Sequence, residues 1–311
     1  MIHRLLKNTS RIFRKKYLLI NFYLFFFSSC QLNPTDSTSN SWNMGKITIA
    51  TDENLKDITE QLTQIYEHEN TQAAVALKFQ PEDKIVHDFM NGTVRSMIIS
   101  RTLTNNERAV SKQNQQVEIE ENIFAYSAVA LIANRSFKDS VIDITSIKNY
   151  LQPGSSTRLV FDNKQSGIPK LIMQKTGIGP ELFKNALVVN NSDEVVDYVR
   201  RTSNAIGFIS FNGISDTYDA RAKEILSSVK LLAIRRNDST FPISQESIYD
   251  FAYPLQYPIN IVLGNNPELV GKGFTNFLCR EKASKILLKA GLVPRFMATR
   301  RIIVHDTLKI N

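Results

Sequence analysis

Short β-branched runs alternate with helically spaced apolar residues from Lys46 onward, and this alternation constrains the fold more than any other feature of the sequence. In the first cycle, Lys46–Ala50 has the branched side chains typical of a strand. Thr51 or Asp52 then offers the side-chain oxygen that commonly caps a helix N-terminus. The helix itself is predicted from apolar residues that share one face: Leu55, Ile58, Leu62, Ile65 and Tyr66.

The same alternation recurs along the chain. Further strands are predicted at 74–79, 97–100, 123–133, 158–161, 187–189 and 205–209. Helices are predicted at 85–90 and 144–151, from Pro169, and after Ser192 as N-cap. Near the end of the chain, Asn266-Pro267 should open one helix and Gly291 should end the next. Such alternation indicates an α/β fold in which a mostly parallel sheet is flanked by helices.

Two extended apolar segments should join two α/β units. Ile123–Ala133 is the first predicted crossing, and Tyr253–Leu263 is the predicted return. We find no repeat of fixed period that would indicate a solenoid.

The N-terminus has the organisation of a secretory signal. The first 16 residues hold six Lys or Arg and no acidic residue, and Tyr17–Phe27 is then almost wholly apolar. This run of 11 residues is shorter than the roughly 20 that a membrane-spanning helix needs. A cleaved signal peptide at residues 1–29 is therefore favoured over a permanent membrane anchor, which is the alternative.

Cys30 follows the apolar run directly. Phe27-Ser28-Ser29-Cys30 resembles the lipobox that the lipoprotein signal peptidase cleaves, with Phe27 at the position that usually holds leucine. Lipidation of Cys30 is predicted, and a buried cysteine behind an uncleaved anchor is the alternative. The next residues, to position 45, are rich in Asn, Ser and Thr and should form a flexible tether.

The net charge of +8 does not indicate a nucleic-acid-binding protein. Six of the 38 Lys and Arg residues precede Cys30, which leaves 32 against 30 Asp and Glu residues. The mature chain is thus nearly neutral and lacks the basic excess of nucleic-acid binders.

Local motifs of catalysis and metal binding are missing from the sequence. The four histidines are scattered, and there is no HExxH, CxxC, GxSxG, GxxxxGK[ST] or GxGxxG pattern. We therefore expect no enzyme activity, no cofactor and no metal site.

Polar turns instead lie where predicted strands meet helix N-termini. They are Thr51-Asp52-Glu53-Asn54, Ser100-Arg101-Thr102 and Asp162 to Gly167. In open α/β sheets such turns face the ligand crevice, and unpaired N–H groups at helix N-termini can bind an oxyanion. Hydroxyls of Thr51, Ser100, Thr102 and Ser166 would add donors. The alternative is that these residues only cap their helices.

Several segments, taken in order, resemble the phosphate-binding proteins of bacterial ABC importers, a branch of the type II periplasmic-binding-protein superfamily. Asn91-Gly92 through Thr104 resembles the family's NGxxDIAIxSRxLT stretch, and Ser166-Gly167 resembles the SGT of its second anion loop. Further likenesses are Ala205-Ile206-Gly207-Phe208 to AIGY, Tyr253 through Pro258 to YPLxRP, and Phe277 through Pro294 to the terminal FLxSxxGQxxxxKAGFVP helix.

The resemblance implies two lobes that close on a small ligand. The expected boundaries are 46–125 for the first part of lobe 1, 126–250 for lobe 2, and 251–311 for the return to lobe 1 with the C-terminal helices. It also implies phosphate or another small oxyanion as the ligand, bound by Thr51, Asp52, Ser100, Arg101, Thr102, Ser166 and Gly167. An ABC permease of the inner membrane would be the partner.

Three residues depart from the family pattern at positions that handle phosphate. Arg95 replaces the aspartate of DIA, Asp162 replaces an arginine four residues before SGT, and Ile168 replaces the threonine of SGT. Acidic side chains oppose an oxyanion unless they accept its proton, so Arg101 becomes the best remaining charged contact. The alternative function is an envelope sensor or scaffold lipoprotein that has the same fold and has lost phosphate binding.

Overall fold

The structure is a computed structural model that describes residues 41–115, 118–163, 166–264 and 269–297. Cys30, the signal peptide, most of the tether and the predicted helix start at Asn266-Pro267 lie outside these residues. Ser41–Asn311 is one compact unit. No helix among the described residues is both long enough and apolar enough to cross a membrane.

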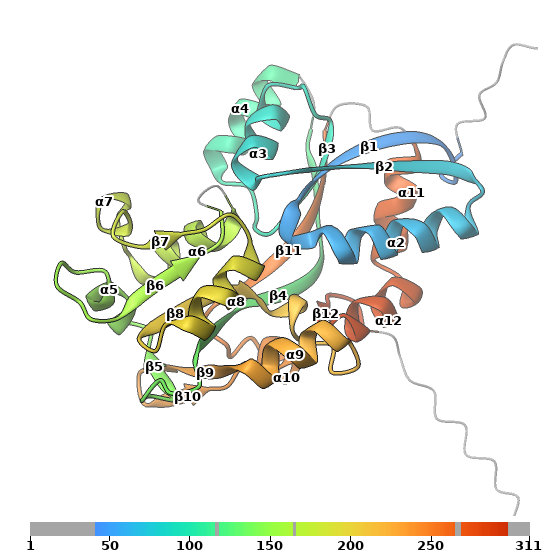
Figure 1. Ribbon diagram of the computed structural model, residues 1–311. Helices are drawn as coiled ribbons and strands as arrows, with labels where there is room; N and C mark the ends of the chain where they lie inside the picture. Colours follow the sequence, from blue (N-terminus) through green and yellow to red (C-terminus); the bar gives the residue numbers. More distant parts are fainter. Residues whose placement is uncertain (1–40, 116–117, 164–165, 265–268, 298–311) are drawn as a thin grey trace, which may run out of the picture. The chain divides into compact units, whose positions relative to one another are not determined.

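Twelve strands form one connected sheet in the described part of the chain, and its main path runs β2-β1-β3-β11-β4-β8-β6-β7 (Figure 1). The strands on this path are β1 (Met44–Asp52), β2 (Gln72–Gln80), β3 (Ser96–Ile99), β4 (Glu120–Asn134), β6 (Arg158–Phe161), β7 (Leu187–Val188), β8 (Ala205–Ser210) and β11 (Gln256–Leu263). Four further strands off this path complete it, namely β5 (Val141–Asp143), β9 (Val229–Arg236), β10 (Ser239–Phe241) and β12 (Val293–Pro294).

Helices connect these strands and pack on the sheet. They are α2 (Lys56–Glu69), α3 (Glu82–Met90), α4 (Asn105–Gln115), α5 (Ser146–Tyr150), α6 (Gly167–Thr176), α7 (Pro180–Phe183), α8 (Ser192–Arg201), α9 (Ala220–Ser228), α10 (Gln245–Tyr249), α11 (Leu269–Leu278) and α12 (Glu281–Lys289). Short 3-10 turns, η2 (Glu53–Leu55) and η3 (Phe211–Gly213), follow β1 and β8. The α2 helix contacts β1 and β2, α11 contacts β1, and α8 contacts β4, β6 and β8.

The sheet is mixed, with parallel pairs towards both ends of its path. The β1 strand pairs in parallel with β2 and β3, and β6 pairs in parallel with β7 and β8. The crossing strands β4 and β11 pair antiparallel with each other and with their neighbours on the path. The predicted α/β fold is therefore confirmed, and its parallel character belongs to the βαβ-connected strands rather than to the crossings.

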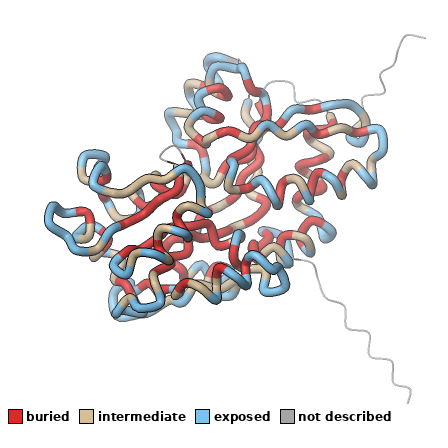
Figure 2. Tube along the Cα trace, in the orientation of Figure 1, coloured by how far each residue is buried: buried red, intermediate tan, exposed pale blue. Residues whose placement is uncertain are grey.

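The long strand β4 changes partners along its length. Up to Ala128 it pairs with β11, and from Val129 it pairs with β8 and β9. Its residues from Ala128 to Ala133 are all buried, which Figure 2 shows as part of a continuous buried stretch through the middle of the sheet. Both crossings predicted from apolar runs are thus present as strands.

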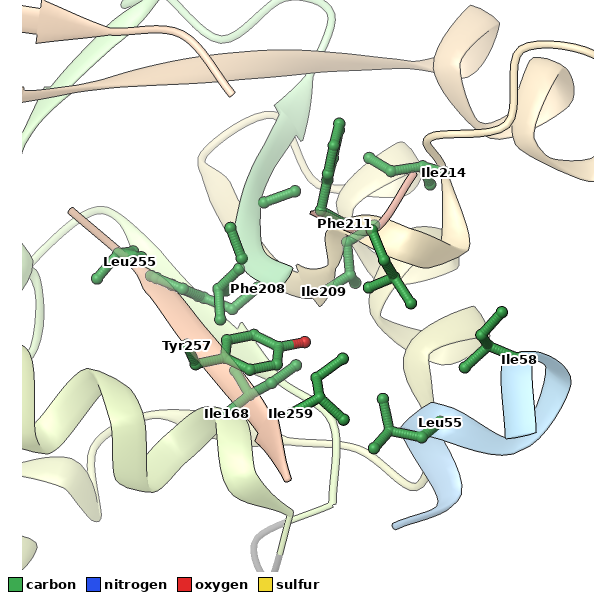
Figure 3. Packing of buried hydrophobic residues seen from close by; sticks show 14 of the residues in the cluster. Leu55, Ile58, Ile168, Phe208, Ile209, Phe211, Ile214, Leu255, Tyr257 and Ile259 are labelled. Atoms are coloured by element: carbon green, nitrogen blue, oxygen red, sulfur yellow. The ribbon is translucent and has the colours of Figure 1, made fainter. Parts of the chain in front are cut away.

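Side chains from several elements meet next to the crossing β11. Figure 3 shows Tyr257 and Ile259 of β11 beside Ile168 of α6, with Leu55 close to Ile259. All four are nearly inaccessible to solvent, so the turn after β1 and the start of α6 share one hydrophobic cluster. Burying a side chain of this size contributes roughly 1.5–3 kcal/mol.

Two predicted helix starts differ in detail from the structure. Asn191, not Ser192, caps α8, because its side chain accepts a hydrogen bond from the Glu194 N–H at 3.0 Å. Asp52 caps the 3-10 turn η2 rather than α2 itself, with its Oδ1 accepting from the Asn54 N–H at 2.9 Å. The first difference arises because the neighbours Asn191 and Ser192 offer equivalent capping oxygens, and the second because η2 lies between Asp52 and α2.

Candidate functional site

A pocket of about 480 Å³ opens where β1, β6 and β8 end and where α8 begins. The carboxyl ends of strands are the usual place for a ligand in an open α/β sheet. The lining residues that carry polar or charged side chains are Asp52, Glu53, Asn54, Lys56, Asp57, Asp162, Asn163, Ser166, Asn190, Asn191, Ser192, Asp193, Ser210, Asn212 and Arg221.

Asp52 is the most deeply buried acid of this pocket, with 1% of its surface exposed. Burial raises the pKa of its carboxyl to about 8, and the negative charges of Glu82 and Asp162 add to the rise. The N–H groups of Asn54 and Gly167 oppose the rise. No donor among the described residues has hydrogen-bonding geometry to Asp52 Oδ2. A buried carboxyl oxygen is therefore left without a partner at the edge of the pocket.

Asp162 lies at the end of β6, on the same pocket. Burial raises the pKa of its carboxyl to about 6. Hydrogen bonds from the side chains of Ser166, Asn54 and Ser192 lower this pKa and so limit the rise. Ser166 Oγ donates to Asp162 Oδ1 at 2.9 Å, and Ser192 Oγ donates to Oδ2 at 3.4 Å. The hydroxyl hydrogens that an oxyanion would need are thus given to a carboxylate of the protein itself.

Glu82 brings a third carboxylate to this region and is fully buried. It is the first residue of α3, and its Oε2 accepts the backbone N–H of Ser100 at 3.1 Å. A Cβ at Gly167 would lie only 2.9 Å from this oxygen, so the Glu82 carboxylate sits directly against the start of α6. An internal carboxylate therefore occupies the place where the sequence predicted a bound oxyanion.

Arg101 points its guanidinium at two glutamates. Its Nε donates to Glu82 Oε1 at 2.9 Å, and its terminal nitrogens donate to both carboxylate oxygens of Glu107 at 2.8 Å. Burial works against the charged form, but the hydrogen bonds and charges of Glu107 and Glu82 outweigh it, so the pKa of Arg101 is raised. A bidentate Arg–carboxylate pair is geometrically specific, and here it uses the donors that would otherwise grip an anion.

A second, much smaller space of about 10 Å³ lies between the turn after β1, Ser100 and the start of α6. This is the volume of about one water-sized sphere. Among the residues that line it are Asn54, Ser100, Gly167 and Tyr257. The Tyr257 hydroxyl, 2.7 Å from Ser210 Oγ, is buried, which raises its pKa to about 12 and keeps it neutral.

The residues predicted to bind a ligand divide into three groups. Asp52 and Ser166 line the large pocket, whereas Ser100 and Gly167 line the small space. Thr51 is completely buried, Thr102 is exposed, and neither lines these two spaces. Arg101 is held by Glu82 and Glu107 rather than facing the large pocket.

Several contributors to the site were not predicted, among them Glu82, Ser210 and Asn212. Glu82 follows Pro81 at the start of α3, where an acidic residue is ordinary and its side chain carries no further signal. Ser210 is the last residue of β8, and Asn212 lies in the η3 turn that follows. The signal available in the sequence was that Ser210 directly follows the predicted apolar strand 205–209.

The described residues contain no group of three or more His, Cys, Asp or Glu side chains placed to hold a metal ion. The polar and charged side chains of the pocket can bind a solute through hydrogen bonds and charge. The carboxylates could accept hydrogen bonds from a solute or balance its positive charge. The donors predicted to bind an anion, such as Ser166 and Arg101, already donate to carboxylates of the protein.

Comparison with known proteins agrees with this architecture. A family described as "PBP superfamily domain" matches residues 36–282 of the chain. The chain belongs to the PBP superfamily. The resemblance and the fold predicted from its motifs are therefore confirmed.

Relatives of this PBP-superfamily chain include phosphate-binding proteins. It is 26% identical over 160 residues to the "Phosphate-binding protein PstS 2" of Streptococcus pneumoniae, covering 50% of this chain and 46% of that protein. The chain thus matches less than half the length of that curated relative.

Two solved structures share its fold. A putative phosphate ABC transporter substrate-binding protein with bound phosphate from Clostridium perfringens superposes with a TM-score of 0.66, at 18% identity, over 80% of this chain and 99% of that one. An ABC-type phosphate transport receptor from Vibrio cholerae gives a TM-score of 0.61 at 22% identity, over 79% of this chain and 99% of that one.

Proposed function

We propose that the chain is the solute-binding protein of an ABC importer, held at a membrane face by lipid on Cys30. The observation that carries the proposal is the pocket of about 480 Å³ at the strand ends of a PBP-superfamily fold. Binding pockets for small solutes commonly have volumes of this order. The solute would be captured without reaction and handed to a permease.

The two-lobed organisation belongs to this proposal. The change of β4 partners between Ala128 and Val129 supports a boundary close to the predicted one at 125/126. With lobe 1 formed by 46–125 and 251–311 and lobe 2 by 126–250, Asp52 and Asp162 come from different lobes. A solute between them would be enclosed if the lobes close by a hinge motion.

Anchoring would keep the binding protein near its permease. A tether such as residues 30–45 allows the lobes to reach the permease without diffusing away, and lipid on one cysteine can hold the chain at the membrane. The expected location is the periplasmic face of the inner or outer membrane. Palmitate labelling of the wild-type chain that disappears in Cys30→Ser would support this location, and labelling that persists would contradict it.

Phosphate is the solute that the relatives suggest, and Arg101→Ala tests it. If phosphate binds through this arginine, isothermal titration should give a Kd in the micromolar range or tighter that weakens on substitution. Arg108→Ala is a matched control, because Arg108 also pairs with a glutamate, Glu121, but lies in α4, outside the turns predicted to bind an anion. If the wild type, Arg101→Ala and Arg108→Ala bind phosphate with the same heat and Kd, Arg101 is excluded as a contact of the ligand.

The second candidate function is an envelope sensor or scaffold that has lost phosphate binding. One observation favours it: the Glu82 carboxylate accepts hydrogen bonds from both the Ser100 N–H and the Arg101 Nε, two donors that an oxyanion would otherwise use. Absence of heat with every oxyanion and every other small solute would support this candidate and contradict the importer proposal.

A further inference from the structure

We propose that the large pocket binds a small organic cation, such as a primary ammonium or guanidinium compound, between the carboxylates of Asp52 and Asp162. This assignment rests on the proposed solute-binding function and names the class of solute. It departs from the phosphate that the relatives suggest.

The first observation is the unpartnered oxygen. Asp52 Oδ2 is buried, lies on a residue that lines the pocket, and has no hydrogen-bond donor among the described residues. A buried acceptor without a donor costs about 1–3 kcal/mol. A ligand that donates a hydrogen bond to this oxygen would remove that cost, whereas an anion would add repulsion.

The second observation is the charge of the lining. Five acidic residues face the pocket against two basic ones, Lys56 and Arg221. Both basic groups are already engaged, because Arg221 pairs with Asp193 and the Lys56 ammonium lies 5.5 Å from the centre of the Phe79 ring. The two most buried acids of the lining, Asp52 and Asp162, repel each other, since the charge of Asp162 raises the pKa of Asp52.

The third observation is the state of the hydrogen-bond donors. Ser166 and Ser192 donate to Asp162, the Asn190 amide donates to Glu194, and the Asn212 amide donates to the Asn54 carbonyl oxygen. These side-chain donors at the pocket are therefore already engaged within the protein. The carboxylate oxygens of the lining can still accept hydrogen bonds, and a ligand with several N–H donors can supply them.

Binding of a cation should therefore release a proton. At pH 7 the Asp52 carboxyl is mostly neutral, because its pKa is about 8. The groups that face it are Glu82 of α3, Asp162 after β6, the Gly167 N–H of α6 and Tyr257 of β11. A positive charge placed between Asp52 and Asp162 favours ionisation of Asp52, so binding should strengthen as the pH rises from 6 to 8.

The test is isothermal titration of the chain from residue 31 with four probes: butylammonium, butylguanidinium, neutral butanol and inorganic phosphate. We expect at least one cation to bind with a Kd below ~1 mM, a reachable affinity for so small a ligand, and butanol and phosphate to bind at least tenfold more weakly. Titrations in two amine-free buffers of different ionisation enthalpy should show proton release at pH 7.

Asp52→Asn should weaken cation binding at least tenfold, and Asp162→Asn provides a second test if the first variant fails to fold. Asp250→Asn, an exposed residue that does not line the pocket, is the matched control and should bind as the wild type does. Cation binding unaffected by either pocket variant would overturn the assignment. Binding of phosphate alone would overturn it and leave the solute-binding function standing, whereas no binding of any probe would count against both.

Discussion

Arg101 Nε donates to Glu82 Oε1 at 2.9 Å, and this pairing joins the loop after β3 to the first residue of α3. The same carboxylate accepts the Ser100 N–H through its other oxygen. Each oxygen of Glu82 therefore has a donor, and the buried charge has a partner. The pair gives Arg101 a structural role that its position within the predicted anion-binding turn Ser100-Arg101-Thr102 did not reveal.

Glu82→Gln should destabilise the fold. The amide can keep one hydrogen bond, but it removes the negative charge that faces Arg101 in a buried setting, and the loss should be on the order of 2 kcal/mol. Urea denaturation monitored by circular dichroism measures it. Glu118→Gln is the control, because the Glu118–Lys112 pair is exposed and should contribute little. Equal effects of the two substitutions would show that the buried pair adds no stability of its own.

Gly273→Ala should release the segment around Trp42 from the domain. A Cβ at Gly273 would lie 1.8 Å from the Trp42 carbonyl oxygen and 2.7 Å from Tyr66 Oη, which donates to that same oxygen at 2.9 Å. We expect the hydrogen bond to be lost, at a cost of about 1 kcal/mol. Trp42 is the single tryptophan of the sequence, so its fluorescence anisotropy should fall.

Gly179→Ala is the control for this experiment, because Gly179 is exposed and a Cβ there would meet nothing within 4 Å. Unchanged anisotropy in Gly273→Ala would mean that the helix α11 shifts to accommodate the methyl group and that Trp42 stays in place.

Strands and helices with strong periodicity could be predicted because their apolar residues face one shared core. Arg158–Phe161 is a strand with the predicted bounds, and the helix predicted from Leu55 onward is present as α2. Elements such as β9 and α10 were not predicted, because Val229–Arg236 mixes charged with apolar residues and Gln245–Tyr249 is only five residues long and mostly polar. Their structure depends on pairing and packing with distant segments.

The site could be predicted in its location but only partly in its chemistry. Asp52 and Ser166 were recognised from their turns, since strand ends converge at one edge of a sheet. That Arg101 would meet Glu82, 19 positions earlier, depends on side-chain directions that no local pattern contains. The sequence predicted a site rich in hydrogen-bond donors, whereas the pocket in the structure is rich in carboxylates.

Gly207→Ala should overpack the core beneath β8. A Cβ there would lie 2.6 Å from Val195 Cγ1, 2.8 Å from Val199 Cγ2 and 3.0 Å from Ile132 Cγ1. Inserting a methyl group into such a site should cost about 1–3 kcal/mol, measured by thermal or urea unfolding. Adding Val195→Ala should recover part of the loss, because it removes the nearest methyl. A double variant less stable than the sum of its parts would contradict this account of the contact.

Asp52→Asn should flatten the pH dependence of stability. Burial raises the pKa of Asp52 from 3.8 to about 8 in the folded chain, so the fold favours the neutral carboxyl. The stability that this proton adds is fully present below about pH 4 and is lost as the pH rises towards 8. The asparagine does not titrate and keeps an oxygen for the Asn54 N–H. Relative to wild type, the free energy of unfolding of the variant should therefore gain up to about 3 kcal/mol between pH 5 and pH 8. Urea denaturation at both pH values measures the change, and the exposed Asp250→Asn should follow the wild type. Parallel pH profiles for wild type and Asp52→Asn would show that this carboxyl does not titrate in the folded chain over that range.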